Sequence, residues 1–435
     1  MNNKKIISVI CTVLFLFITI TGCNDNSQND VSNTASSDNV SATDTSLPKT
    51  KENTSVSETD FQKNMNNGNF GKYISCETTT GYYFLLSNYI CYADKSNMNT
   101  TILCNKPECK HNTTNCNAYL DGANSLTYYN GNIYYDTFDD TEGVYYLYKI
   151  NMDGTDRTKV QELERVSGST SNSPKYIIDN DVVYIKTTEI SNSASATENI
   201  SLYAVNVGDS IDKAVKIDSL NNVEFDKMWA DSGKLYYLVT VNGSDEIYSY
   251  DFKDNKKENV WLVPSVSEVG SWASAEVGAN GWYITDSCLY YFLSGNGMYK
   301  YDLSTKKNEC IVKITDSSRK GIASFDNQYM YINCSNPVVG CSKNEICIYD
   351  LSGNYIGTVS YEDVMSRGDG YNDMDILCTS HEKLFIIGNS MLTNSEGYEY
   401  GIEDVFYISI ANMSDSQFEK LEFDLKDYMV NDQGV

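Results

Sequence analysis

The sequence predicts an all-β chain folded as a seven-bladed β-propeller, and three observations predict it. A tyrosine, or once a phenylalanine, returns between apolar residues at successive spacings of 51, 50, 52, 54, 41 and 54 residues. A period near fifty residues, built from strand-forming side chains, is typical of one four-stranded blade per repeat. Turn-forming residues precede each copy, and most copies are followed by a strand that ends in Asp or Asn. The seven centres are Tyr83, Tyr134, Tyr184, Tyr236, Tyr290, Tyr331 and Phe385.

Each repeat is predicted to hold four strands, with the tyrosine strand second. In the fifth repeat Trp282–Ile284 precedes that strand, Tyr299–Asp302 follows it, and Cys310–Ile314 comes last. Side chains alternate between the two faces of a strand, so Tyr299 and Tyr301 share a face. Buried aromatic side chains cover roughly 150–250 Å² each, so we assign nearly all of the tyrosines to packing between blades. A β-sandwich, the alternative fold, would not give seven units in the same phase.

Residues 1–22 are predicted to be a signal peptide. Lys4 and Lys5 form a basic start, and the apolar run Ile6–Ile20 is too short to span a bilayer as a permanent helix. The run ends in Thr-Gly-Cys, and small residues before a cysteine resemble the lipobox of bacterial lipoproteins. That resemblance implies a lipid on the thiol of Cys23, which becomes the first residue of the mature chain. Ordinary secretory cleavage near Gly22 is the alternative.

Residues 23–60 are predicted to be a disordered polar tether, and residues 61–435 the propeller. The tether consists almost entirely of Asn, Asp, Ser, Thr, Lys and Glu, which cannot bury enough surface to offset chain entropy. The formal net charge of −26 argues against nucleic acid as a partner and against lying flat on an anionic membrane. With a lipid on Cys23, the predicted location is the outer face of the bacterial cell membrane.

The repeat phrase resembles that of a known class of propellers. Ile133-Tyr134-Tyr135-Asp136 is similar to the Tyr-Trp-Thr-Asp repeats of low-density-lipoprotein-receptor-type propellers. The chain resembles still more the relatives of that fold found on bacterial surface lipoproteins, and the resemblance covers residues from about 70 to 425. It implies binding, with no fixed reaction.

A compact group of metal-ligating residues lies between the first and second repeats. Cys104, Cys109, His111 and Cys116 fall within thirteen residues, and the chain has only two histidines. Three cysteines and a histidine form a complete tetrahedral ligand set for structural zinc, with no position left for catalysis. Export favours the competing interpretation, a disulfide with one spare thiol. The sequence leaves both open, together with a third case in which the cluster forms neither.

Cysteine arithmetic bears on the remaining thiols. Setting aside Cys11 and Cys23 leaves eleven cysteines, an odd number that cannot all pair within the chain. Cys334 and Cys341 flank a short loop and form the predicted disulfide. Cys91 and Cys347 occupy the strand position that Tyr148 takes in the second repeat, which is consistent with buried reduced thiols.

Catalytic motifs are absent from the sequence. It holds no Gly-x-Ser-x-Gly elbow, phosphate-binding glycine loop or His-Glu-x-x-His, and His381 falls in a predicted turn. We therefore expect a non-catalytic module that recognises an extracellular glycan, peptide or envelope protein. A carboxylate-based polysaccharide hydrolase or lyase and an envelope-assembly scaffold are the alternatives. Recognition is expected at the longest insertions, 187–199, 263–280 and 390–401, because binding residues gather on loops of rigid scaffolds.

Overall fold

The computed structural model describes residues 74–425 with short gaps, and all described elements belong to one compact unit, Thr45–Val435. The gaps are 112–114, 167–170, 191–197, 222–223, 242–243, 263–280, 286, 294–296, 314–321, 327, 335–343, 367–370, 372, 380–381, 394–398, 414–416 and 424.

Seven four-stranded antiparallel sheets form this unit, and each is built from four consecutive strands. Blade 1 holds β1 (Ser75–Glu77), β2 (Gly81–Leu86), β3 (Tyr89–Asp94) and β4 (Thr100–Ile102). Blade 2 holds β5 (Leu126–Tyr129), β6 (Asn132–Asp139), β7 (Val144–Asn151) and β8 (Thr158–Arg165). Blade 3 holds β9 (Ser171–Asp179), β10 (Val182–Ile190), β11 (Glu198–Asn206) and β12 (Val215–Asn221). Blade 4 holds β13 (Glu224–Asp231), β14 (Lys234–Val241), β15 (Ser244–Asp251) and β16 (Lys256–Leu262).

The last three blades follow the same plan. Blade 5 holds β17 (Trp282–Ile284), β18 (Cys288–Leu293), β19 (Gly297–Asp302) and β20 (Asn308–Lys313). Blade 6 holds β21 (Ile322–Phe325), β22 (Tyr329–Asn333), β23 (Glu345–Asp350) and β24 (Tyr355–Ser360). Blade 7 holds β25 (Asp373–Thr379), β26 (Lys383–Thr393), β27 (Glu399–Ser409) and β28 (Glu419–Lys420). All seven predicted centres lie on the second strand of a blade, which confirms the seven-bladed propeller.

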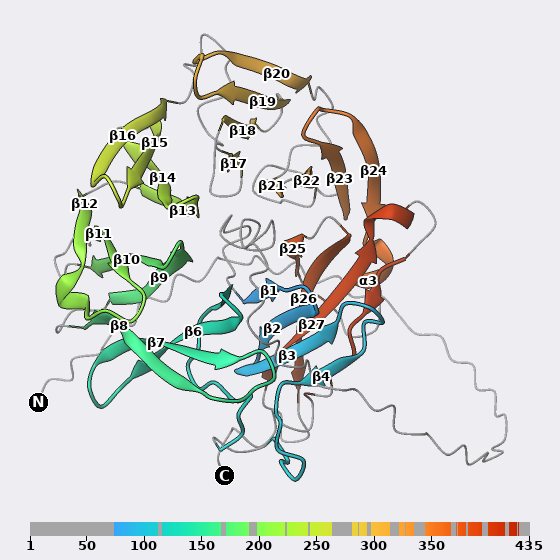
Figure 1. Cartoon of the computed structure of the whole chain (residues 1–435). Coiled ribbons are helices and arrows are strands. Elements are labelled where there is room, and N and C mark those ends of the chain that lie inside the picture. The colour runs from blue at the N-terminus through green and yellow to red at the C-terminus, as the bar shows by residue number, and fades with distance from the viewer. Residues whose placement is uncertain are drawn as a thin grey trace, which may run out of the picture. The chain divides into compact units, whose positions relative to one another are not determined.

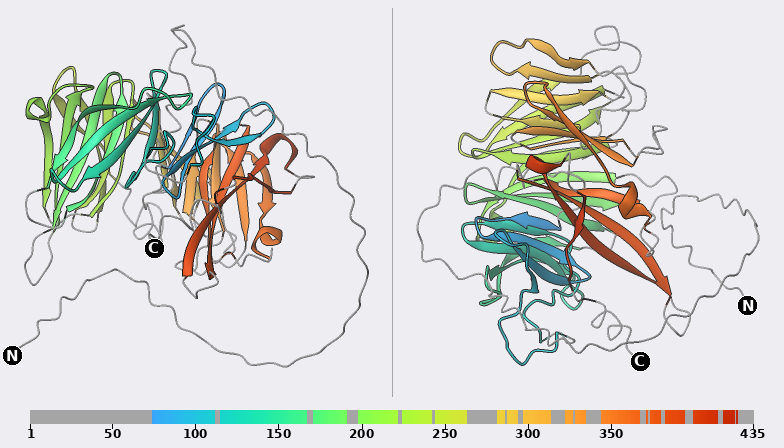
Figure 2. Two further views of the ribbon diagram at one scale, coloured as in Figure 1. Left: turned by 90° about the horizontal axis from the view of Figure 1, so that it is seen from below. Right: turned by 90° about the vertical axis from the view of Figure 1, so that its right-hand side faces the viewer.

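The blades stand around a central axis, with their first strands innermost (Figure 1). First strands of neighbouring blades touch, as β1 touches β5 and β5 touches β9. Seen from the side, the strands run from one face of the ring toward the other (Figure 2).

Stacked aromatic rings recur at one position of the blade. The second and third strands face each other with Tyr135 against Tyr148, Tyr237 against Tyr248 and Tyr291 against Tyr299. The ring centroids of these pairs lie 5.5, 5.6 and 5.2 Å apart. Aromatic contacts also join blades, since Trp261 of β16 lies 4.7 Å from Tyr291 of β18. The tyrosines in these contacts therefore build the blades and their interfaces, as predicted.

The ring closes without a shared strand in the described chain. β1 is the first strand of blade 1, and β25–β28 supply all four strands of blade 7. β1 touches β25, and Phe385 of β26 packs against Tyr82 and Phe84 of β2, at centroid distances of 4.6 and 5.6 Å. Side-chain packing, and not a hydrogen-bonded sheet, holds this seam.

Helical structure in the described residues is short. It consists of η1 (Ile211–Lys213), α3 (Glu362–Met365) and η4 (Ile410–Asn412). In that part of the chain no helix has the length and apolar character needed to cross a bilayer.

The described ends of two predicted insertions are strand. In blade 3, β10 and β11 stay paired out to Ile190 and Glu198, and in blade 7, β26 and β27 stay paired out to Thr393 and Glu399. The expectation that recognition occurs at these insertions stays a prediction. The tips of these two hairpins and the whole of 263–280 lie outside the described residues.

Candidate metal centre

The predicted ligand set comes together in space. The ligand atoms of Cys104, Cys109, His111 and Cys116 all lie within 4.8 Å of one another. His111 Nδ1 lies 3.3 Å from Cys116 Sγ. Ligands around a tetrahedral zinc lie about 3.5–3.8 Å apart, given Zn–S near 2.3 Å and Zn–N near 2.0 Å. The set therefore needs to contract by about 1 Å at its widest separation to hold the ion.

Backbone pairing at both ends fixes the loop that carries these ligands. Where β4 ends, Leu103 N–H donates to Ile90 O at 2.9 Å. The chain returns to the same edge of β3, where Ile90 N–H donates to Ala118 O and Leu120 N–H to Asn88 O. The loop is thus an excursion between two stretches that pair with one strand. A metal ion bound to all four ligands would close it.

Turns inside the loop point the ligands toward one another. Cys109 N–H donates to Lys106 O across the turn that contains Pro107. His111 has a φ of +55°, in the left-handed region, and its N–H donates to Cys109 Sγ at 3.4 Å. The peptide hydrogen of His111 thus points at the sulfur of a neighbouring candidate ligand.

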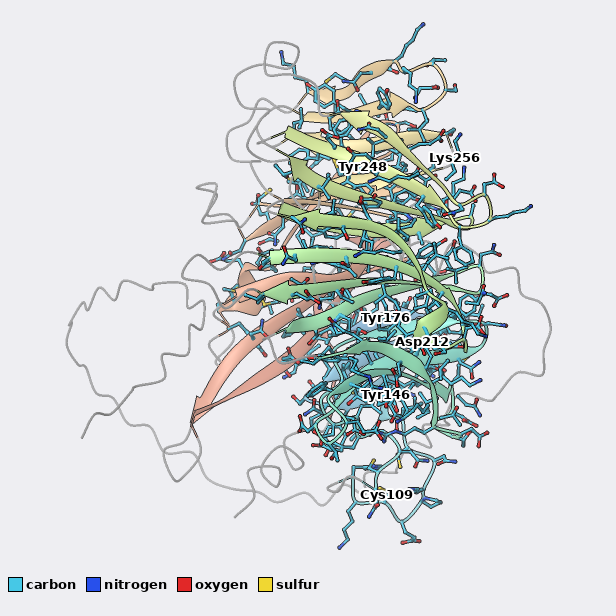
Figure 3. All side chains as sticks on the ribbon, turned by 90° about the vertical axis from the view of Figure 1, so that its left-hand side faces the viewer. Cys109, Tyr146, Tyr176, Asp212, Tyr248 and Lys256 are labelled. Atoms are coloured by element: carbon cyan, nitrogen blue, oxygen red, sulfur yellow. The ribbon has the colours of Figure 1, made fainter. Side chains whose placement is uncertain are left out.

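Blades 1 and 2 both hold the loop in place. Tyr89 of β3 donates its hydroxyl hydrogen to His111 O at 2.7 Å. From blade 2, Arg157 donates to Tyr119 O at 3.0 Å, and Gly154 O accepts from Asn117 Nδ2 at 2.9 Å. Cys109 lies on this loop where it projects from the sheets (Figure 3).

Without a bound cation, burial and hydrogen bonds shift the pKa values of the candidate ligands in different directions. Burial acts to raise the pKa of Cys104, but hydrogen bonds from the backbone at Lys106 and Asn117 outweigh it and lower that pKa. Burial and the neighbouring Cys104 raise the pKa of Cys116 to about 12, and burial lowers the pKa of His111. A neutral imidazole and one favoured thiolate are suited to a divalent cation, which would deprotonate the other thiols. With four protein ligands the centre fits a structural role, with no open position for catalysis.

Close packing against the loop makes Gly154 sensitive to substitution. It has a φ of +79°, and an added Cβ would lie 2.5 Å from Leu103 O. Gly131, in the β5–β6 turn of the same blade, has a φ of +77° but nothing within 4 Å of such a Cβ. We expect Gly154→Ala to lower the free energy of unfolding by about 1–3 kcal/mol more than Gly131→Ala, measured by urea unfolding. Equal losses in the two variants would contradict this contact.

A second titratable group lies at the boundary between blades 1 and 7. Glu77 ends β1 and is buried, with its Oε1 atom 2.7 Å from Lys95 Nζ. Lys95 Nζ is also 3.9 Å from Glu382 Oε2, just before β26. Burial raises the pKa of Glu77 to about 7 against the opposing effect of Lys95, and the charges of Glu382 and Asp326 add to the rise.

This raised pKa predicts that stability falls as pH rises. Between pH 4.5 and about 7 the folded protein keeps a proton on Glu77 that the unfolded chain has lost. Stability from this group is greatest at the acidic end of that window, and the difference amounts to about 3 kcal/mol. We expect Glu77→Gln to remove most of this fall in urea unfolding across the window. The variant Glu258→Gln, at an exposed site, should keep the fall in stability with pH. If stability falls equally steeply with pH in Glu77→Gln, Glu77 is not its source.

Other predicted positions are placed less fully. Cys23, Cys341 and His381 lie outside the described residues. Cys334 is described and is buried at the end of β22 in blade 6. The sequence did not single out Glu77, because its environment is made by three blades that are far apart along the chain.

Comparisons with known proteins bear on the fold. No protein-family model and no curated protein matches the chain. Several solved structures do match the chain. One is prolyl oligopeptidase B from Galerina marginata, with a TM-score of 0.45 and 11% identity, and the match covers 83% of this chain and 51% of that one. Another is the β-propeller domain of the trilobed protease from Pyrococcus furiosus, with a TM-score of 0.42 and 12% identity. The match covers 80% of this chain and 92% of that one. The computationally designed Ika8 protein is a third, with a TM-score of 0.40 and 9% identity. The match covers 76% of this chain and 95% of that one.

Proposed function

We propose that this protein is a lipid-anchored recognition module on the outer face of a bacterial cell membrane. In this proposal Cys23 carries the lipid, residues 24–60 form the tether, and the propeller binds an extracellular glycan, peptide or envelope protein without transforming it. The lipobox-like ending of the signal segment and the polar composition of the tether support the anchor.

The projecting metal loop is the observation that carries the recognition role. Its outer residues Asn105, Lys106, Pro107, Glu108 and Lys110 are exposed, yet contacts from blades 1 and 2 fix the loop at both ends. The sheet of blade 1 consists of β1–β4, so the loop is an addition to a complete blade. An exposed, charged projection held on a rigid scaffold presents a preformed contact surface, which lowers the entropy lost on binding.

A binding screen tests this role directly. The full chain, in detergent, is applied to a glycan array and a peptide array with and without a zinc chelator. We expect one ligand class to bind, and the double variant Glu108→Ala/Lys110→Ala to weaken that binding at least tenfold without lowering Tm. Unchanged affinity in the double variant would place recognition elsewhere. Turnover of an arrayed glycan would favour an enzyme, and co-purification of an envelope protein without ligand binding would favour a scaffold.

The anchor has a separate test. In a bacterial host that processes lipoproteins, the wild-type chain is expected in the membrane fraction, with a mature N-terminal peptide that begins at a lipid-modified Cys23. Cys23→Ser should leave the folded propeller free of the membrane fraction. An unmodified mature N-terminus in the wild type would support ordinary secretory cleavage instead.

A carboxylate-based hydrolase has one specific observation in its favour. Glu77, with a pKa of about 7, has the protonation behaviour of a general acid, and Asp326 and Glu382 act on it electrostatically. Both Glu77 and Asp326 are nevertheless engaged. Glu77 pairs with Lys95, and Asp326 accepts hydrogen bonds from Gln328 N–H, Tyr329 N–H and the Tyr331 hydroxyl. These contacts favour a structural role for both groups, and a polysaccharide hydrolysis assay on Glu77→Gln separates the two functions.

A further inference from the structure

Two buried cysteines meet in blade 6. Cys334 directly follows β22 and Cys347 lies in β23, and their Sγ atoms are 3.7 Å apart. Both residues are at most 1% exposed. Ile332 is the register partner of Cys347, and Cys334 N–H donates to Glu345 O at 2.8 Å. The two thiols are therefore diagonal neighbours across adjacent antiparallel strands.

The sequence of blade 6 explains why the sulfurs approach each other. At the position where blades 2, 4 and 5 stack two tyrosines, blade 6 has Ile332 and Cys347, and blade 1 has Phe84 and Cys91. A cysteine there is smaller than a tyrosine and leaves room beside it. In blade 6 the side chain of Cys334 reaches that space, with its Sγ 3.7 Å from Ile332 O. Cys347 Sγ also lies 3.4 Å from Thr358 Oγ1 of β24.

We propose that Cys334 and Cys347 form a disulfide that links β22 to β23. Their sulfurs must close from 3.7 Å to the roughly 2.0 Å of a disulfide bond. This pairing differs from the Cys334–Cys341 bond that the sequence predicted. It goes beyond the proposed function and does not depend on which ligand the propeller binds.

The oxidation balances with a small-molecule disulfide as oxidant. One cysteine, as its thiolate, attacks that disulfide, forms a mixed disulfide and releases one small thiol. The second cysteine then attacks the mixed disulfide at the protein sulfur and releases the other small thiol. The protein loses two hydrogens and two S–H bonds, and the oxidant is reduced to two thiols. Because both cysteines are buried, the reaction proceeds during folding or through local opening of the blade.

Tryptic digestion distinguishes a Cys334–Cys347 bond from a Cys334–Cys341 bond. Cleavage after Lys320, Lys343 and Arg367 places Cys334 and Cys341 together on peptide 321–343, and Cys347 alone on peptide 344–367. The full chain is incubated with oxidised glutathione, quenched with acid, alkylated while denatured, digested and analysed by mass spectrometry. We expect the two peptides to be joined, and to separate after reduction. In Cys341→Ser they should still be joined, which excludes a bond from Cys341 to Cys347.

Cys91 provides the internal control, because it occupies the matching position of blade 1 and should be alkylated in the same sample. A bond within peptide 321–343 would overturn the proposal. So would alkylation of both Cys334 and Cys347 after prolonged oxidation, or loss of the joined peptides in Cys341→Ser. As a second readout, oxidation should raise the urea midpoint of the wild type and leave that of Cys347→Ala unchanged.

Discussion

Replacing Cys116 with serine, or chelating the metal, is expected to open the 104–116 loop to protease while the seven blades stay folded. The loop is bounded at both ends by backbone pairing to β3, so its loss leaves β1–β4 intact. A metal ion bound to all four ligands would hold it between those ends, and in zinc-dependent domains such binding energy is folding energy. Without the metal, the three sulfurs and the imidazole lie within 4.8 Å of one another with no ion to hold them together.

The peptide bond after Lys110 is a built-in reporter of this opening. It joins two residues between ligands Cys109 and Cys116, and trypsin does not cleave after Lys106 because Pro107 follows. A ligand that binds only the closed loop suppresses opening in proportion to its concentration over Kd. With free zinc a hundredfold above Kd, cleavage should slow by about a hundredfold, equivalent to about 2.7 kcal/mol. Time courses of digestion with and without chelator measure this ratio.

Elemental analysis and a matched variant complete the test. The wild type should carry one zinc per chain, and Cys116→Ser should carry none. Cys310→Ser removes an exposed cysteine of β20 in blade 5 and should retain the metal. A metal-free wild type with a disulfide among Cys104, Cys109 and Cys116 would show that the zinc interpretation is wrong. The digestion pattern would then respond to reductant and not to chelator.

The repeat could be predicted from the sequence because local chemistry specifies each blade. The third strand ends in an acid that starts the next turn, as when Asp302 accepts hydrogen bonds from Ser304 N–H and Thr305 N–H. Those bonds lower the pKa of Asp302 to about 2. Asp350 accepts from Ser352 and Asn354 in the same way. Such signals lie within a few residues of one another, so a single chain reveals them.

The candidate metal centre was predictable for the same reason, since its four ligands fall within thirteen residues. Two other features were not. Glu77 gains its raised pKa from burial and from the charges of Glu382 and Asp326, against the opposing effect of Lys95, and these two acids lie far from it along the chain. Cys334 meets Cys347 only through the register of β22 and β23, whereas sequence spacing favoured Cys341. The resemblance to Tyr-Trp-Thr-Asp-repeat propellers stays a sequence-based prediction.

The seam between blades 7 and 1 gives the other large expected effect. Phe385 is fully buried in one core cluster with residues of blade 1, and its ring meets Tyr82 and Phe84 across the seam. Phe385→Ala should lower the free energy of unfolding by about 3–5 kcal/mol, because it leaves a cavity that rigid sheets on both sides cannot fill. Urea unfolding of the two proteins measures the loss.

The strands that exchange hydrogen faster in each variant distinguish a seam residue from an ordinary core residue. Phe406, on β27 of the same blade, is as fully buried, but its cluster joins blades 6 and 7, and its ring contacts Tyr371. Phe406→Ala should cost a similar free energy. Because no shared strand closes the ring among the described residues, Phe385→Ala should speed hydrogen exchange most in blade 1 and β25–β28. Phe406→Ala should do so in blades 6 and 7. The same exchange pattern in both variants would mean that the ring opens as a whole, and that side-chain packing at this seam is no weaker than at any other blade interface.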